Sequence, residues 1–132
     1  RLTTNKPCFV MDTRRDFIFV DDLLEVVLMA LHGKGQKGVY HISSGSDFSI
    51  KDLFNATIQA LGVKLERDVE VRPRNPDDVF TILLDPSRTQ QEFSGWKVRT
   101  PLEVGVKAAI DWYRQFGIAQ TFTHLKGIDE KK

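Results

Sequence analysis

The sequence predicts one α/β domain over residues 1–132, in which short strands alternate with amphipathic helices. Short apolar runs rich in aromatic and β-branched residues recur along the chain, and such runs are typical of strands. Between them, apolar residues recur at helical spacing in segments that end at a glycine. The 41% hydrophobic and 28% charged residues are the composition of an ordinary globular domain, long enough to bury a core.

The first third of the chain predicts two strands and a helix. The apolar runs 8–11 (CFVM) and 17–20 (FIFV) are too short for helices and favour strands. A helix follows in DDLLEVVLMAL. Asp22 lies three residues before a glutamate, which is the spacing of a capping box, and Asp21 is the alternative cap. Gly33 is placed to end this helix.

The middle of the chain predicts a strand, a turn and a second helix. Residues 39–43 (VYHIS) read as the strand. The helix covers residues 50–61, with Ser49 and Asp52 as its capping box and Gly62 behind its end.

The last third predicts two short strands and two helices. Residues 69–73 (VEVRP) and 80–84 (FTILL) favour strands. Each helix then begins with a capping residue followed by proline, the caps being Asp85 and Thr100. Gly117 ends the second helix.

Residues 33–38 (GKGQKG) have the G-x-G-x-x-G spacing of a dinucleotide-binding loop. Such a loop follows a strand and opens a helix, so that the helix N-terminus faces the phosphates. Here the predicted order is reversed, because a helix precedes the glycines and a strand follows them. We therefore expect a helix stop and a loop, and no NAD bound at these glycines.

Composition excludes several classes of function. The net charge of +1 gives no basic footprint for nucleic acid or for an acidic membrane surface. No apolar run approaches membrane-span length and no signal peptide is visible, so a cytoplasmic protein is expected. The single cysteine, Cys8, favours a buried thiol, and three scattered histidines predict no metal site.

Six short motifs occur in a fixed order. They are RDFIFVDD (15–22), YHISSG (40–45), PDDV (76–79), DPSR (85–88), GW (95–96) and PLE (101–103). With them the chain resembles the C-terminal part of the NAD-dependent sugar-nucleotide epimerases and dehydratases, the extended short-chain dehydrogenase/reductases. The resemblance covers residues 7–116, and its wording is closest to the nucleotide-sugar epimerases of bacterial surface-polysaccharide pathways.

The resemblance implies a C-terminal, substrate-binding portion of such an enzyme. Residues 39–43 would be the last strand of a parallel sheet with flanking helices, beside a small mixed α+β lobe that holds the nucleotide sugar. The family's glycine-rich loop and Tyr-x-x-x-Lys pair are not found here, so NAD is expected to be bound by an N-terminal Rossmann half absent from this chain. We expect the chain alone to be inactive, and to associate with a Rossmann half or with a second copy through an unpaired strand edge.

Four residues are candidates for substrate binding, and two of them match residues of the family. Arg15 corresponds to the arginine that contacts the diphosphate, and Asp78 to the aspartate near the nucleotide ribose. Asn75 stands where the family has a second phosphate-binding arginine. Arg74 is the candidate to replace that arginine, with Arg72 as the alternative.

From the residues alone, these positions also have simpler explanations. Arg15 would be a surface arginine paired with Asp12 or Asp16, and Arg14 would be solvated. An aspartate such as Asp78 commonly caps a turn. The alternatives to a substrate-binding portion of an enzyme are a stand-alone nucleotide-sugar binding module without activity, and a structural fragment.

Overall fold

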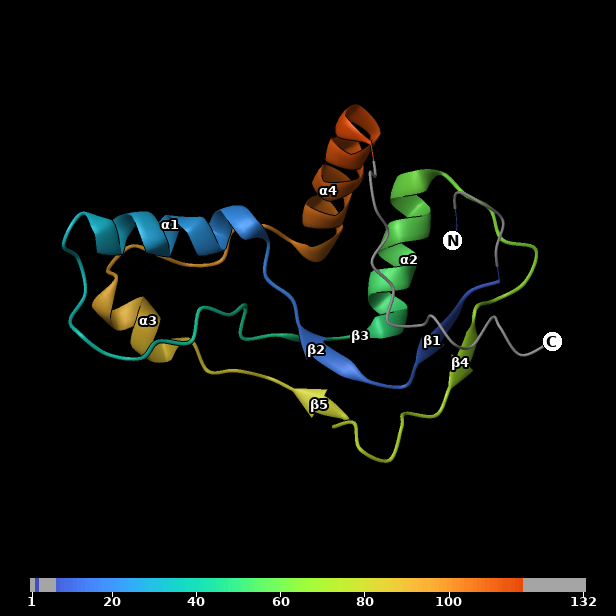
Figure 1. Ribbon diagram of the computed structural model, residues 1–132, viewed down its shortest axis with the longest axis horizontal. Coiled ribbons are helices and arrows are strands. Elements are labelled where there is room, and N and C mark those ends of the chain that lie inside the picture. The colour runs from blue at the N-terminus through green and yellow to red at the C-terminus, as the bar shows by residue number, and fades with distance from the viewer. Residues whose placement is uncertain (1, 3–6, 118–132) are drawn as a thin grey trace.

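Five short strands and four helices make up the part of the chain that the structure, a computed structural model, describes: residue 2 and residues 7–117 (Figure 1). In order they are β1 (Phe9–Met11), β2 (Arg14–Asp16), α1 (Val20–Leu31), β3 (Asp47–Ser49), α2 (Ile50–Leu61), β4 (Glu70–Arg72), β5 (Thr81–Ile82), α3 (Ser87–Glu92) and α4 (Leu102–Phe116).

The strands form two small sheets. β1 pairs with β4 in parallel, with Phe9 opposite Glu70. In the second sheet β2 is the central strand, antiparallel to β3 on one side and parallel to β5 on the other. Arg15 is therefore opposite Phe48 of β3 and Ile82 of β5. Three segments far apart in the sequence thus meet at β2.

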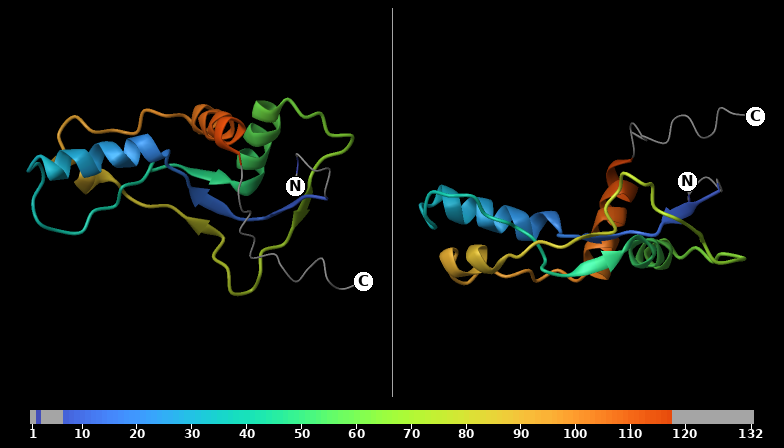
Figure 2. Two further views of the ribbon diagram at one scale, coloured as in Figure 1. Left: turned by 45° about the horizontal axis from the view of Figure 1, so that its top comes forward. Right: turned by 90° about the horizontal axis from the view of Figure 1, so that it is seen from below.

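The helices lie in two groups. α2 and α4 pack against each other beside the strands, while α1 and α3 lie together at the other end of the molecule (Figures 1 and 2). The buried residues Val26, Phe93 and Trp96 join α1 to the segment at the end of α3. We call these three residues the helical core. Partly buried Tyr40 and Ile42 pack against it.

The capping box of α2 is confirmed. The Ser49 hydroxyl accepts a hydrogen bond from the Asp52 backbone N–H at 3.0 Å, and the Asp52 carboxylate accepts one from the Ser49 N–H at 2.9 Å. Gly62 follows the helix with φ of 69°, in the left-handed region that favours glycine. Strands at residues 9–11, 70–72 and 81–82 also lie within the predicted runs.

The strand predicted at residues 17–20 is wrong. The strand is β2, residues 14–16, and α1 begins at Val20. The apolar side chains of this run pack against helices instead, since Ile18 lies on the helical core and Phe19 lies against Gly105 of α4. Strand position follows backbone pairing, and β3 and β5 pair with the charged residues.

Residues 39–43 are extended but form no strand, which corrects a second prediction. No strand in the described part of the chain pairs with them. Instead the Thr89 hydroxyl donates a hydrogen bond to the His41 carbonyl at 2.6 Å. The Tyr40 ring meets Phe93 edge to face, with centroids 5.1 Å apart. Side-chain contacts therefore hold this segment in place. The backbone hydrogen bonds expected between it and a neighbouring strand are not formed among the described residues.

The N-caps predicted for α1, α3 and α4 differ from those in the structure. α1 has Phe19 at its N-cap, and neither aspartate caps it. Asp22 is buried, and its two carboxylate oxygens accept the backbone N–H groups of Arg99 and Thr100, each at 3.1 Å. Thr100 therefore belongs to this bridge, and α4 has Pro101 at its N-cap.

At α3 the cap is displaced by one residue. Pro86 is the N-cap, and the Asp85 carboxylate accepts the Ser87 backbone N–H at 2.9 Å. The hydrogen bond from the Ser87 hydroxyl and, to a smaller extent, that from the Ser87 backbone N–H lower the pKa of Asp85.

The GKGQKG segment follows α1 and leads into residues 39–43, so within the described residues it does not open a helix as a dinucleotide-binding loop does. Gly33 and Gly35 both have φ of 77°. A Cβ atom on Gly35 would lie 2.5 Å from the Phe93 ring, and one on Gly38 would lie 2.6 Å from the Arg88 guanidinium. These glycines are therefore explained by packing and by backbone conformation.

Candidate functional site

Two adjacent arginines of β2 reach different neighbouring segments, Arg14 toward β3 and Arg15 toward the loop before β5. Arg14 reaches β3, where its Nε–H donates to the Asp47 carboxylate at 2.6 Å. This pairing lowers the pKa of Asp47 and raises the pKa of Arg14. The expectation of a solvated Arg14 is wrong, because this arginine joins β2 to β3.

Arg15 reaches the loop before β5. Its Nη2 donates to the Asp78 carboxylate at 2.6 Å, and its Nη1 donates to the Val79 carbonyl at 3.1 Å and to the carbonyl of Arg14 at 2.7 Å. The prediction that Arg15 pairs with Asp12 or Asp16 is therefore wrong. Within the described residues, the Nε–H of Arg15 has no hydrogen-bond partner. One edge of the guanidinium is therefore available to an anion.

Asp78 is also held by its own loop. Arg74 donates from Nη1 to the Asp78 carbonyl at 2.6 Å, and the Asp78 backbone N–H donates to the Asn75 carbonyl at 3.0 Å. The structure thus brings Arg15, Arg74, Asn75 and Asp78 into one group, which we call the Arg15–Asp78 site. The Asn75 side chain has no hydrogen bond among the described residues. Asn75 takes part only through its backbone carbonyl.

Arg72, the alternative to Arg74, lies elsewhere. Its guanidinium pairs with Glu70, with 2.9 Å between Arg72 Nε and Glu70 Oε1. It also lies over the Phe9 ring, 3.8 Å from the centroid. The Arg72 side chain therefore makes its contacts within the sheet formed by β1 and β4.

Asp16 is a supporting residue whose role the sequence did not reveal. Its Oδ1 accepts the backbone N–H of Ser44 at 2.8 Å and the Ser44 hydroxyl at 2.6 Å, while Oδ2 accepts the Gly45 N–H at 3.1 Å. These bonds attach the turn at 44–45 to β2 beside Arg15. A sequence separation of 28 residues gives no local signal for such a contact.

The Arg15–Asp78 site suits binding. Arg15 contacts the Asp78 carboxylate and Arg74 contacts the Asp78 backbone carbonyl, so two guanidinium groups lie at this residue, and guanidinium groups match phosphate oxygens well. The Oδ2 atom of Asp78 accepts no hydrogen bond from the described residues, so it can accept one from a hydroxyl group. Arg74 is exposed and Asp78 is half-buried, which leaves both open to a ligand.

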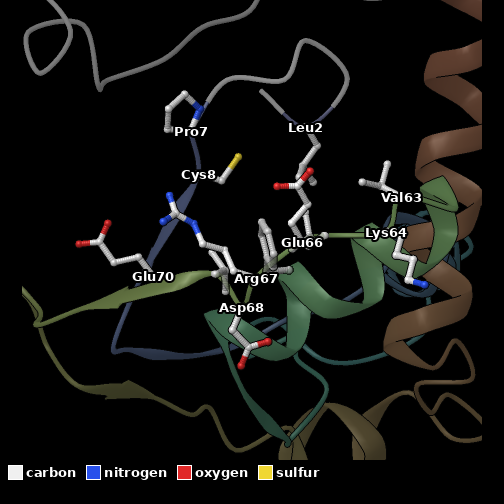
Figure 3. A pocket seen from close by; sticks show the side chains of 12 residues that line it. Leu2, Pro7, Cys8, Val63, Lys64, Glu66, Arg67, Asp68 and Glu70 are labelled. Carbon is white, nitrogen blue, oxygen red and sulfur yellow. The ribbon is translucent and has the colours of Figure 1, made fainter.

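A cavity of about 780 Å³ lies apart from this group (Figure 3). Its walls are the loop after α2 (residues 63–69), with Phe54, Glu70 and the residues Pro7 and Cys8. None of the four predicted site residues lines it. Charges of both signs surround it, including Lys64, Glu66 and Arg67, so its lining selects no class of ligand (Figure 3).

Among the described residues, no group of three or more histidine, cysteine, aspartate or glutamate side chains is arranged to hold a metal ion. None of the helices there is both long and apolar enough to cross a membrane.

Comparison with known proteins reveals relatives of one kind. The chain is 44% identical to the Bordetella bronchiseptica enzyme WbmH, solved with NAD+, with a TM-score of 0.80 over 89% of this chain and 39% of that one. It is 34% identical to WbmG of the same organism, solved with NAD and UDP, with a TM-score of 0.83 over 95% of this chain and 40% of that one.

A curated relative extends this similarity. A putative UDP-glucose 4-epimerase of Methanocaldococcus jannaschii is 31% identical over 100 residues, or 76% of this chain and 31% of the relative. The chain therefore spans about a third of that epimerase and two-fifths of each Bordetella enzyme. No protein-family model matches the chain.

Proposed function

We propose that this chain, which its relatives and structural neighbours place with the extended short-chain dehydrogenase/reductases, is the nucleotide-sugar binding portion of an NAD-dependent sugar-nucleotide epimerase or dehydratase. One observation carries the proposal. The candidate substrate-binding residues Arg15, Arg74, Asn75 and Asp78 form a single group, although Arg15 lies 59 positions before Arg74, the first of the three loop residues.

In this proposal Arg15 and Arg74 bind the diphosphate. Arg15 uses its Nε–H edge, since its other donors hold the loop at residues 78–80. Arg74 uses the donors that remain after its bond to the Asp78 carbonyl. Arg74 thereby supplies the second positive charge that Asn75 lacks.

Asp78 binds the nucleotide ribose. Its Oδ1 is held by Arg15, and its Oδ2 accepts a ribose hydroxyl. Because Arg15 fixes the carboxylate, little side-chain freedom is lost when the ligand binds. The chain's contribution to the reaction is then the positioning of the sugar.

The residues 33–38 do not fit a bound dinucleotide, because Phe93 and Arg88 occupy the space beside Gly35 and Gly38. NAD supplies reversible hydride transfer in enzymes of this kind. We propose that it is held by a portion like the remaining three-fifths of the Bordetella enzymes. We assign no residue of this chain to NAD.

Calorimetric titration of the chain with UDP tests the proposal. Arg15→Ala and Arg74→Ala should each weaken UDP binding by about 10- to 100-fold, because each removes a charge-assisted hydrogen bond. Arg14→Ala is the matched control, since it removes the same charge from the neighbouring residue on the opposite side of β2. Its UDP affinity should stay within about twofold of the unaltered chain.

The result that contradicts the proposal is equally definite. A folded chain that fails to bind UDP, or whose Arg15→Ala and Arg74→Ala variants bind UDP as tightly as the unaltered chain, has no nucleotide site at Arg15. Far-ultraviolet circular dichroism and urea unfolding of each variant establish that it is folded.

A further inference from the structure

The carboxylate of Asp16 holds two segments that lie far from it in the sequence. Its Oδ1 accepts the backbone N–H and the hydroxyl of Ser44. Its Oδ2 accepts the Gly45 N–H at 3.1 Å and, over a longer 3.5 Å, the Leu84 N–H. An ionised carboxylate has about four acceptor positions, so these four donors leave Asp16 none for a ligand.

The contact with Leu84 extends a short ladder. β2 lies between β3 and β5 and pairs with β5 at only two positions, Arg14 with Thr81 and Arg15 with Ile82 (Figure 1). Strand ends with so few backbone bonds open readily unless other contacts hold them. Past these two pairs, β2 reaches the other segment through the Asp16 side chain at Leu84.

The turn that Asp16 holds also contacts Leu84. The Ser43 side chain is 3% exposed, and its hydroxyl donates to the Leu84 carbonyl at 3.5 Å. Both polar backbone groups of Leu84 therefore meet the unit formed by Asp16 and the turn at residues 43–45.

The opposite end of the same segment carries the candidate site. Arg15 donates to the Asp78 carboxylate and to the carbonyls of Val79 and Phe80. We call residues 78–84 the site segment. Arg15 and Asp16, adjacent on β2, thus hold the site segment at its two ends. A segment fixed in this way presents Asp78 and Arg15 together, whereas a loose segment has to be ordered when a ligand binds.

We propose that Asp16 is a positioning residue of the Arg15–Asp78 site. It fixes the far end of the site segment, and ligand affinity depends on it although its own oxygens are occupied by protein donors. The inference rests on the proposed function and adds to it a residue that acts through the backbone of the site segment.

Asp16→Asn tests the inference. An amide that keeps its oxygen toward Ser44 turns its NH2 group against the N–H groups of Gly45 and Leu84, so the far end of the site segment is released. NMR titration with UDP should show an affinity about 3- to 30-fold weaker than that of the unaltered chain. Thermal unfolding of the same samples establishes that the variant is folded.

Asp47→Asn is the matched control. Asp47 lies opposite Asp16 in the register of β2 and β3, and its carboxylate also joins two segments, through Arg14. Both variants should lower the unfolding temperature, but Asp47→Asn should keep its UDP affinity within about twofold of the unaltered chain. A residue with a merely structural role would behave as Asp47 does.

A double variant shows whether Asp16 acts through the site. Without Arg15, the ligand contacts that remain, at Arg74 and Asp78, lie on one loop, so the far end of the site segment no longer matters to them. Adding Asp16→Asn to Arg15→Ala should therefore change the UDP affinity less than about twofold.

Three results overturn the inference while the proposed function stands, with UDP binding weakened by Arg15→Ala. They are unaltered UDP affinity in folded Asp16→Asn, equal weakening by Asp16→Asn and Asp47→Asn, and a full additional loss in the double variant. If Asp16→Asn does not fold, Asp16→Glu takes its place, because it keeps the charge and displaces the carboxylate by one methylene, with the same expectations. A folded, unaltered chain that does not bind UDP contradicts the proposed function itself, and the inference with it.

Discussion

Two regions of this chain tie distant segments together by different physical means. The helical core joins α1 to the end of α3 through buried apolar and aromatic contacts. The strand network, which we define as the side chains of Arg14, Arg15 and Asp16 with their partners, joins β2 to three other segments through ion pairs and hydrogen bonds. The first excludes water almost completely, whereas the second remains partly exposed.

This difference implies that the helical core contributes mainly to stability and the strand network mainly to ligand binding. Buried apolar area contributes several kcal/mol at each large side chain, whereas an exposed ion pair contributes about 1 kcal/mol or less. Exposed, pre-oriented charges are what an anionic ligand requires. We therefore expect substitutions in the helical core to change mainly the free energy of unfolding, and substitutions at Arg15 to change mainly ligand affinity.

Phe93→Ala should have the largest effect. Phe93 is 3% exposed and contacts the Tyr40 ring, so its truncation should lower the free energy of unfolding by about 3–5 kcal/mol. Phe116→Ala, at a position 61% exposed, is the control and should cost about 1 kcal/mol or less. Urea unfolding followed by fluorescence measures both, and equal losses would mean that Phe93 is not a core residue.

Gly35→Ala should have the second-largest effect on the stability of the fold. It combines left-handed backbone strain, at about 1–2 kcal/mol, with a clash against the Phe93 ring that typically costs about 1–3 kcal/mol. Gly33→Ala has the same φ of 77° but nothing within 4 Å of the added methyl group, so it isolates the strain alone. Thermal unfolding compares the two variants, and the packing explanation of the G-x-G-x-x-G segment fails if they are equally stable.

Asp22→Asn tests a polar interaction inside the helical region. Both carboxylate oxygens accept backbone N–H groups, and an amide can replace only one of them as an acceptor. The free energy of unfolding should fall by about 1–3 kcal/mol. Asp21→Asn, at the exposed neighbour, should be close to neutral in the same urea titration. A neutral Asp22→Asn would show that this bridge does not stabilise the fold.

Ser49→Ala tests the capping box where β3 meets α2. Loss of the cap should cost about 1 kcal/mol. The pKa of Asp52 lies below its ordinary value, chiefly because of its hydrogen bonds with Ser49. A lowered carboxylate pKa stabilises the fold at pH values above the unfolded pKa, and this stabilisation is lost as the pH falls below about 4. Unfolding measured between pH 6 and about pH 2.5 should show a smaller acid-induced loss in Ser49→Ala. An identical acid-induced loss in both proteins would exclude this linkage.

Arg15→Ala should have the smallest effect on stability. The pair that Arg15 forms with Asp78 is partly exposed, so its loss should lower the free energy of unfolding by about 1 kcal/mol or less. The same change should weaken UDP binding at least tenfold under the proposed function. A loss of several kcal/mol in urea unfolding, with unchanged UDP affinity, would reverse the contrast between the two regions.

Local chemistry explains what the sequence predicted correctly. The capping box at Ser49, the glycine after each of α1, α2 and α4, and the helix before residues 33–38 all depend on neighbours within a few positions. The α/β class follows from the alternation of strand-like and helical segments. The resemblance also marked Arg15 and Asp78 as candidate site residues by motif, and Arg74 became a candidate as the arginine next to Asn75.

The errors share a different cause. Apolar residues 17–20 predicted a strand, but pairing partners at β3 and β5 placed the strand on Arg14–Asp16 instead. Residues 39–43 have strand composition, but a strand also needs a neighbour, and the described chain contains none for them. Composition indicates what a segment can form, whereas the long-range partner decides whether it forms it.

The sequence by itself determined the fold class, the helix ends at glycine and the residues to test for nucleotide binding. Only the tertiary structure decided that Asp22 bridges to Arg99 and Thr100, and that Arg15 pairs with Asp78. Those pairs are separated by more than 60 positions, and many acidic residues along the chain offer equivalent chemistry. The choice among equivalent partners is made by the packing of the helices and strands that carry them, because a hydrogen bond forms only within about 3 Å.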